Sequence, residues 1–181
     1  MNAKIVGLVS LLLCAGGASA TPSFESTVAR PAIAPEDSGL SLPSGVVLRE
    51  IFRIYRPATN THVTHFYWPE NWEGIGYKYE GTLGFISATP FENSALIRNC
   101  VGPHSWNYFT SLDPNCEAST GGVVLPGDWN LGYISTVQIP GSVPLYRCGF
   151  VWQGKIRHFD SRDFACEGVG GTGAVLGYVF L

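Results

Sequence analysis

The sequence is poor in charge and lacks the basic excess of nucleic-acid-binding proteins. Only 14% of its 181 residues are charged, and 11 lysines and arginines are outweighed by 14 aspartates and glutamates. Binding to a nucleic acid requires a basic stripe that displaces counterions from the phosphates. The composition therefore argues against a nucleic acid as the partner, and it gives no sign of binding to an anionic membrane.

A hydrophobic run long enough to span a membrane is also missing. The apolar run Ile5–Ala15 falls short of the roughly 20 residues that a transmembrane helix needs. It follows Lys4 and precedes Ala18-Ser19-Ala20, which is the pattern of a secretory signal peptide cleaved after Ala20. We therefore expect residues 1–20 to be a signal peptide and the mature protein to be secreted, either extracellular or periplasmic.

Motifs of catalysis and metal binding are absent as well. The chain contains no G-x-S-x-G nucleophile elbow and no close C-x-x-C cysteine pair. His62 and His65 lie three residues apart in an expected strand, so they point to opposite faces and are unsuited to a shared metal. We therefore expect a protein without enzyme activity, cofactor or metal.

The residues after the expected signal peptide do not look like part of a folded core. Four prolines fall within residues 21–45, with alanine, serine and threonine between them. Such a segment cannot bury enough apolar surface to offset the entropy lost on ordering. The sequence therefore predicts a linker over residues 21–46 and a single folded domain over residues 47–181.

The expected domain is organised as three imperfect copies of one pattern, at about 47–88, 94–136 and 143–181. Each copy has a strand-like stretch with an arginine, a second stretch rich in aromatic residues, a polar turn with a glutamate, and a Leu-Gly-aromatic stretch. The third copy is the clearest and the first is the most degenerate. The shared positions are Phe66, Phe109 and Phe159; Glu73, Glu117 and Glu167; and Gly84, Gly132 and Gly177.

The composition predicts an all-β domain. β-branched and aromatic residues are frequent, 22 glycines and 12 prolines break up the chain, and no long segment has a helical period. Copies this short must share a core, and three of them suit a closed arrangement without exposed strand edges. We expect a β-trefoil, or alternatively a three-fold β-prism or a small three-bladed arrangement. The glycine of each Leu-Gly pair predicts a bulge or a close backbone approach where the copies meet.

Four cysteines follow the expected signal peptide, and an even number in a secreted protein predicts two disulfides. Cys100 and Cys116 hold the places in the second copy that Cys148 and Cys166 hold in the third. We therefore expect Cys100–Cys116 and Cys148–Cys166. The first copy has Trp72 where the others have the second cysteine, so an aromatic contact is expected to replace the crosslink there.

The order of these motifs resembles a repeat family of secreted bacterial and fungal proteins that is classed as a domain of unknown function. The resemblance rests on PLYRC, HFDSRDFACEG and LGYVF in the third copy, and it extends more loosely over residues 47–181. The first copy departs from it because it lacks both cysteines. The resemblance implies a secreted tandem-repeat domain with glycan recognition as a possible role, and it supplies no catalytic residues.

The recurring charged residues have a structural interpretation. An arginine lies in the first strand of each copy, as Arg98, as Arg147 and as either Arg53 or Arg56. We expect each guanidinium to pair, through two hydrogen bonds, with the glutamate of its own copy, which is Glu73, Glu117 or Glu167. The alternative is a polar pocket for a sugar hydroxyl.

The remaining aromatic and polar residues are candidates for a ligand site. A carbohydrate-binding protein places an exposed tryptophan or tyrosine against the C–H face of a sugar, while polar side chains bind the hydroxyls. Against this stands the simpler interpretation that many of these rings fill the core. The candidates are His65, Trp106, Tyr108, Trp129, Trp152, His158 and Asp160.

We therefore predict a secreted, monomeric, lectin-like domain that binds a glycan or a cell-wall polysaccharide. The alternative is a secreted protein-binding module, such as a protease inhibitor or a host-interaction factor, with Val123–Asn130 as its exposed loop. A structural envelope protein without a discrete ligand is a third hypothesis.

Overall fold

The computed structural model describes residues 42–104, 106–125, 129–169 and 172–181, all within one compact unit of the chain. The expected signal peptide (residues 1–20) and most of the expected linker (residues 21–41) lie outside the described residues. The described part contains no α-helix, only three short 3-10 turns, which confirms the all-β prediction. Its strands are β1 (Leu48–Arg56), β2 (Thr61–His65), β3 (Lys78–Ser87), β4 (Ser94–Val101), β5 (Tyr108–Ser111), β6 (Val123–Val124), β7 (Asn130–Ser135), β8 (Ser142–Trp152), β9 (Lys155–Ser161) and β10 (Ala174–Phe180).

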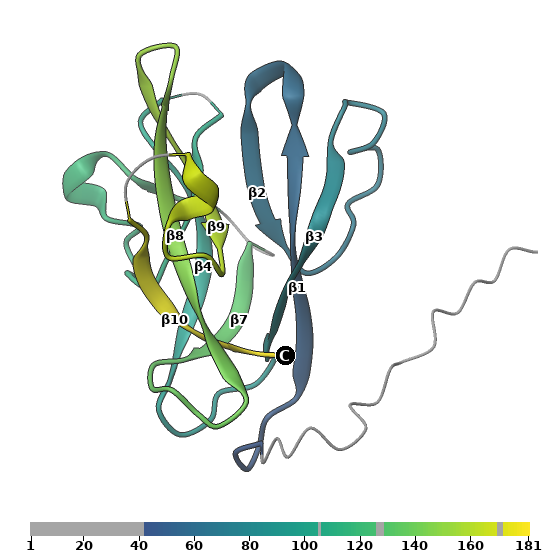
Figure 1. Cartoon of the computed structure of the whole chain (residues 1–181), viewed down its shortest axis with the longest axis vertical. Helices are drawn as coiled ribbons and strands as arrows, with labels where there is room; N and C mark the ends of the chain where they lie inside the picture. Colours follow the sequence, from purple (N-terminus) through teal and green to yellow (C-terminus); the bar gives the residue numbers. More distant parts are fainter. Residues whose placement is uncertain (1–41, 105, 126–128, 170–171) are drawn as a thin grey trace, which may run out of the picture. The chain divides into compact units, whose positions relative to one another are not determined.

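Three successive segments of the domain pair their strands in the same antiparallel order (Figure 1). In the first segment β1 lies between β2 and β3; in the second, β4 lies between β5 and β7; in the third, β8 lies between β9 and β10. The short strand β6 is an additional partner of β4. The central strand of each segment is thus the one that contains the predicted arginine.

Each segment interrupts its strand register at the Leu-Gly pair. Ile51 of β1 faces Gly84, but the next residue of β1 faces Thr82, so Leu83 is left without a partner. Leu131 in β7 and Leu176 in β10 are bypassed in the same way. A bulge of this kind bends the strand and redirects its side chains. The leucines are at most 7% exposed, and the predicted bulge is confirmed.

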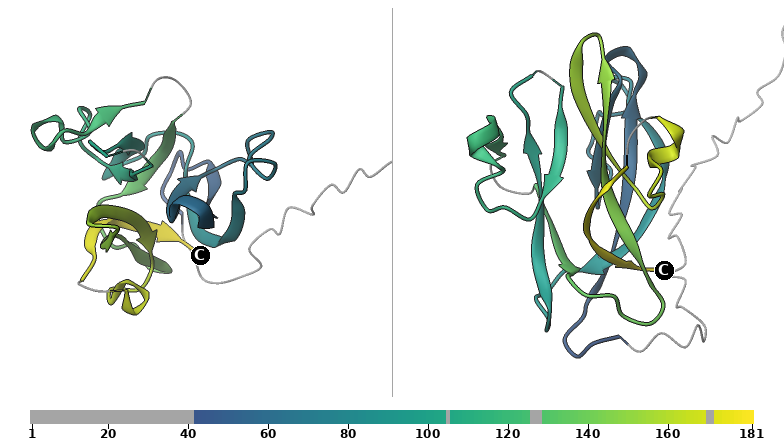
Figure 2. Two further views of the ribbon diagram at one scale, coloured as in Figure 1. Left: turned by 90° about the horizontal axis from the view of Figure 1, so that it is seen from above. Right: turned by 60° about the vertical axis from the view of Figure 1, so that its left-hand side comes forward.

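The glycines of the three Leu-Gly pairs allow the last strands to approach one another closely. A Cβ added to Gly84 of β3 would lie 2.8 Å from a carbonyl oxygen of β10. One added to Gly132 of β7 would lie 2.5 Å from an oxygen of β3, and one added to Gly177 of β10 would lie 2.6 Å from an oxygen of β7. Since φ is also positive at all three residues, only glycine fits. The predicted close backbone approach is confirmed, and the strand groups surround a common centre (Figure 2).

The main hydrophobic core lies along these last strands and their partners. Each segment contributes three buried aliphatic residues, two from its last strand and one from its first strand. They are Ile51, Leu83 and Ile86; Ile97, Leu131 and Ile134; and Leu145, Leu176 and Val179.

Smaller clusters stabilise the other end of each segment. The disulfides Cys100–Cys116 and Cys148–Cys166 are present as predicted, and each packs with one phenylalanine. In the first segment an aromatic and aliphatic cluster occupies this place, and Trp72 packs against it. The ring of Trp72 lies 4.6 Å from that of Tyr77, between ring centroids. The expected aromatic replacement for the missing crosslink is therefore confirmed.

The strand register corrects the alignment of the arginines. In each first strand, one residue faces the glycine of the last strand, and the residue two positions later is Arg53 in β1, Asn99 in β4 and Arg147 in β8. Arg53 rather than Arg56 is therefore the matching arginine of the first segment. Arg98, which we predicted to be its counterpart in the second segment, is one position out of register, so that segment has an asparagine in place of the arginine.

The second strand of the first segment is also shifted from the predicted alignment. Phe109 faces Cys100 in the second segment, and Phe159 holds the same position in the third. The residue at this position in β2 is Val63, and Phe66 follows the strand and packs against the main core. The prediction that Phe66 matches the other two phenylalanines is therefore wrong.

Candidate functional site

The matched polar residues of the first strands connect different segments. Arg53 donates from Nη1 to a carbonyl oxygen of β9 at 2.8 Å, and Arg147 donates from Nη1 to one of β5 at 3.0 Å. Asn99 donates from Nδ2 to a carbonyl oxygen of β2 at 2.7 Å. The three first strands are thereby bound to three second strands, each in another segment.

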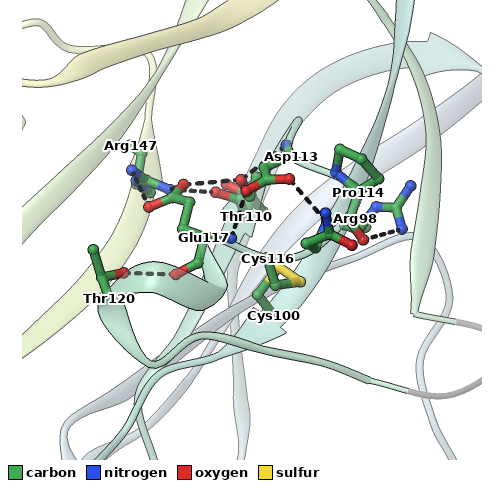
Figure 3. Close-up of a disulfide and its surroundings, with 11 residues drawn as sticks. Arg98, Cys100, Thr110, Asp113, Pro114, Cys116, Glu117, Thr120 and Arg147 are labelled. Atoms are coloured by element: carbon green, nitrogen blue, oxygen red, sulfur yellow. Dashed lines mark hydrogen bonds and ion pairs between the residues drawn. A yellow bond between two sulfur atoms is a disulfide. The ribbon is translucent and has the colours of Figure 1, made fainter.

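The two arginines also form ion pairs across segments, so the predicted pairing within each copy is wrong. Arg53 donates to both carboxylate oxygens of Glu167, at 2.7 and 3.0 Å. Arg147 donates to those of Glu117, at 2.5 and 3.3 Å (Figure 3). The hydrogen bond from Arg53 is the main cause that lowers the pKa of Glu167. Burial alone would raise the pKa of Glu117, but hydrogen bonds from Arg147 and Ser111 lower it overall.

The other two residues predicted for this role have different surroundings. Arg98 donates from Nη1 to the carbonyl oxygen of Pro114 at 3.1 Å, within its own segment (Figure 3). Glu73 is exposed in the turn after β2, and the described residues show no ion pair for it. Where the second segment has Asn99 in place of arginine, the ion pair that the other two interfaces contain is therefore missing.

Asp160 lies where the second strands of all three segments meet. It is 3% exposed, and its carboxylate accepts hydrogen bonds from the hydroxyls of Thr64 at 2.6 Å and Thr110 at 2.7 Å. Burial raises its pKa. The oxygens of Asp160 bind β2 and β5 and are closed off from solvent, which favours a structural role for this residue over the ligand binding that we predicted.

Three more of the predicted ligand residues form an aromatic cluster. His65 is 1% exposed, its ring lies 5.5 Å from that of Trp129, and burial lowers its pKa to about 4. Its Nδ1 accepts a hydrogen bond from the backbone N–H of Phe66 at 3.1 Å. Trp129 stacks on Tyr108 with 5.9 Å between ring centroids and 6° between ring planes. Tyr108 and Trp129 pack against the cluster of the first segment, and the burial of His65 favours the simpler interpretation for that residue.

The last three predicted ligand residues do not lie in that cluster. Trp106 is 43% exposed, and the guanidinium of Arg56 lies 4.8 Å from its ring. Trp152 ends β8, with the guanidinium of Arg157 at 5.6 Å. His158 in β9 lines a separate cavity between the second and third segments. The seven predicted residues therefore do not form one site.

A different group of residues forms an open cavity of about 450 Å³ in the first segment. Two aromatic rings at this cavity face solvent, since Trp68 is 39% exposed and Tyr79 is 49% exposed. A carboxylate and an ammonium group lie beside them. The lining residues are Trp68, Glu73, Gly76, Tyr77, Lys78 and Tyr79, and we call this group the aromatic platform.

Local structure holds the aromatic platform in place. The turn between β2 and β3 is closed by backbone hydrogen bonds, including Gly76 N–H to the carbonyl oxygen of Glu73 at 2.9 Å. Tyr77 is 3% exposed, and burial raises its pKa to about 12. The hydroxyl of Tyr79 lies 2.8 Å from that of Thr82, and its ring contacts Phe52 with 5.4 Å between centroids. Tyr79 is thus held at its hydroxyl and at its ring while the side chain stays half exposed.

A slightly larger cavity, of about 490 Å³, lies between the first and third segments. Its central group, Arg53, is already paired with Glu167 at 2.7 Å and with Glu80 at 2.8 Å. No aromatic residue lines it. The aromatic platform is the better candidate for a binding site because its rings and its charged groups are both accessible.

Sequence reasoning recognised only part of the aromatic platform. Glu73 was assigned to an ion pair, and Trp68, next to Tyr67 in the sequence, was not among the candidates. Tyr79 was missed because it lies in the strand-like run Lys78-Tyr79-Glu80, where a tyrosine is expected to pack. The available signal was the clustering of aromatic and charged residues on both sides of one turn.

The structure describes only part of the loop that motivated the protein-binding alternative. Within Val123–Asn130, the first two residues form β6 on β4, and residues 126–128 lie outside the described residues. Within the described ranges, no group of three or more His, Cys, Asp and Glu residues gathers in a way that could hold a metal ion. The part of the chain that the structure describes has no helix long and apolar enough to cross a membrane.

Comparison of the chain with protein-family models, with curated proteins and with solved structures gives no match. The resemblance to the secreted repeat family therefore stays a prediction.

Proposed function

We propose that the protein is a secreted, non-catalytic domain that binds a glycan or a cell-wall polysaccharide through the aromatic platform. The observation that carries the proposal is the pair of solvent-facing rings, Trp68 and Tyr79, beside Glu73 and Lys78 in one open cavity. A flat apolar ring face covers the C–H side of a sugar. Charged side chains form hydrogen bonds with the sugar hydroxyls and so replace those that the hydroxyls made to water.

The three segments support a further part of the proposal, that the domain arose as three repeats around a pseudo-three-fold axis. The same strand order, the same bulge and the same glycine contacts occur in each segment. Among the predicted architectures, the three-bladed arrangement suits this pairing best, because each segment pairs its own strands and meets the other two through its last strand. The secreted repeat family remains the proposed relative.

Export of the protein is supported by its crosslinks. Two disulfides indicate an oxidising, extracellular-type environment, since such bonds are rare in reducing compartments. A polysaccharide outside the cell is therefore a ligand that the protein would meet.

Affinity electrophoresis through gels containing plant, fungal or bacterial polysaccharides tests the proposal. We expect at least one polysaccharide to retard the wild-type protein, and Trp68→Ala and Tyr79→Ala each to remove most of the retardation. The control is Trp106→Ala, which removes a ring of similar exposure outside the platform and should bind as the wild type does. Retardation by none of the polysaccharides, or equal retardation of all four proteins, contradicts the proposal.

A further inference from the structure

The strand register gives three matching positions on the second strands, and their surroundings differ. These positions are His62 in β2, Tyr108 in β5 and His158 in β9. The residues that face them across the hairpin are Tyr55, Val101 and Gly149.

Two of the three matching rings are covered by another ring of the protein. Tyr55 stacks on His62 with 4.6 Å between ring centroids and 21° between ring planes. Tyr108 is stacked on Trp129, nearly parallel at 6°. A flat ring face at this position is therefore filled from within the chain at two places out of three.

The third ring, His158, has no such cover from the residue opposite it. Gly149 faces it and carries no side chain, and a Cβ built there would meet His158 Cδ2 at 3.7 Å, an ordinary van der Waals contact. A side chain could therefore stand there without strain, as Tyr55 does in the first segment. Next to the imidazole lies a cavity of about 250 Å³.

The lining of this cavity is rich in hydrogen-bonding groups. His158 Nδ1 lies 3.0 Å from the amide oxygen of Asn107, so Nδ1 is the donor and Nε2 is left as an acceptor. Burial, followed by the charge of Arg147, lowers the pKa of His158 to about 4, which leaves the imidazole neutral at pH 7. The ion pair of Glu117 and Arg147 and the side chain of Thr120 lie on other walls. Figure 3 shows these three residues near the Cys100–Cys116 disulfide.

Apolar residues line other parts of this cavity. Phe109 contacts His158 with 5.6 Å between ring centroids, and Pro103 and Ile156 line the cavity as well. The volume is below the roughly 300 to 1,000 Å³ typical of drug-sized ligands, which favours a ligand of a single ring. The acceptor Nε2 of His158 favours a hydroxylated ring over an aromatic one, because an aromatic ring offers this nitrogen no hydroxyl donor.

We propose that this cavity binds a single pyranose ring stacked on the imidazole of His158, which is the ring that a side chain at position 149 would contact. The proposal rests on the glycan-binding function and adds a second, smaller subsite that takes one sugar residue, whereas the aromatic platform takes part of a chain. The sugar face lies on the imidazole, and its hydroxyls bind Nε2 of His158, Thr120 and the Glu117 carboxylate.

The variant Gly149→Tyr tests the subsite because it restores the internal ring of the first segment. Gly149 is exposed and its φ is not positive, so the substitution does not strain the backbone. The matched control, Gly149→Ala, adds only a Cβ in ordinary contact. Both variants should fold as the wild type does, which thermal unfolding verifies.

Titration of the ¹⁵N-labelled proteins with glucose, galactose, mannose and N-acetylglucosamine provides the measurement. We expect at least one of these sugars to shift the amide signals of Gly149 and Thr120 and the ring signals of His158 in a saturable manner. The shifts should persist in Gly149→Ala and in Trp68→Ala and be lost in Gly149→Tyr.

Two results would overturn the proposed subsite. In the first, none of the four sugars shifts these signals; in the second, Gly149→Tyr binds a sugar as well as Gly149→Ala does. Titration with p-cresol, the side chain of tyrosine, adds a further arm, and saturable binding of p-cresol without binding of any sugar reassigns the cavity to aromatic groups of a protein partner. Because Trp68→Ala leaves this cavity intact, loss of polysaccharide retardation and loss of monosaccharide binding are separate results.

Discussion

The centre of the domain and the spaces between its segments are built on different rules. At the centre every segment does the same thing, with a bypassed leucine and a glycine pressed against the next last strand. Between the segments the interfaces are not all alike, because two of them contain an arginine and glutamate pair and the third has an asparagine instead. Features that all segments share are needed to close the core, so the features that only one segment has are where a ligand is to be sought.

The largest effect is expected from the shared centre. In Gly132→Ala the new Cβ would lie 2.5 Å from a backbone oxygen of β3 at a positive φ, so clash and strain add. We expect a loss of more than about 4 kcal/mol in the free energy of unfolding, measured by urea denaturation.

The matched control is Gly81→Ala. Gly81 also has a positive φ, but a Cβ there meets nothing within 4 Å. We expect a loss of about 1 to 2 kcal/mol, from backbone strain alone. Equal losses in the two variants would show that the close approach of the last strands does not limit stability.

The crosslinks come next, and they distinguish the first segment from the other two. Replacing Cys148 and Cys166 together by alanine should cost about 3 kcal/mol by the loop-entropy estimate. The same change at Cys100 and Cys116 should cost a similar amount, because the two loops are of similar length. If the free energy of unfolding fell by less than about 1 kcal/mol for one pair only, the two disulfides would not have equivalent roles in the second and third segments.

A smaller effect of the opposite sign is expected at Asp160, which one segment alone contributes to the junction of the second strands. Burial raises its pKa in the folded protein, so the folded state binds its proton more tightly than the unfolded state does. Stability from this group is therefore present at low pH and is lost as the pH rises through the folded pKa. Asp160→Asn keeps an acceptor for one threonine hydroxyl and removes the buried charge.

We expect Asp160→Asn and the wild type to be equally stable in acid, and the variant to gain relative to the wild type as the pH rises. The measurement is urea denaturation of both proteins from pH 3 to pH 8. A variant that loses stability relative to the wild type as the pH rises would show that the carboxylate is favoured in its charged form.

The sequence predicted what depends on contacts within one segment. Cys100 and Cys116 pair in the same way as Cys148 and Cys166, and comparison of the copies was enough to choose this connectivity. The Leu-Gly bulge was also predictable, because glycine in a strand has few other roles.

Side-chain pairs between segments were not predictable in the same way. Comparison of the copies shows that residues such as Arg147 and Glu117 have counterparts. It does not show that the guanidinium of Arg147 pairs with a glutamate of the neighbouring segment instead of its own. Arg98 was matched to the other arginines because it is itself an arginine. The bulge sets the strand register, however, and in that register Asn99 holds the matching position. The segment without the arginine is the second one, where Asn99 binds β2 instead.

The candidate site was only partly predictable for a related reason. Burial separates a packed ring from a ligand-binding ring, and it depends on which strand faces which neighbour. His65 was predicted as a ligand residue and is 1% exposed, whereas Tyr79 was overlooked and is 49% exposed. Both are polar aromatic residues in strands, and only the tertiary structure tells them apart.

The smallest effect on stability and the largest on function are expected from one substitution in the aromatic platform. Trp68→Ala removes a half-exposed ring, so its free energy of unfolding should stay within about 1 kcal/mol of the wild type. Isothermal titration with a soluble oligosaccharide of the polysaccharide that retards the wild type then tests the central claim most directly. The account predicts saturable binding by the wild type and by Trp106→Ala, and none detectable by Trp68→Ala. Equal affinity of Trp68→Ala and the wild type would contradict it.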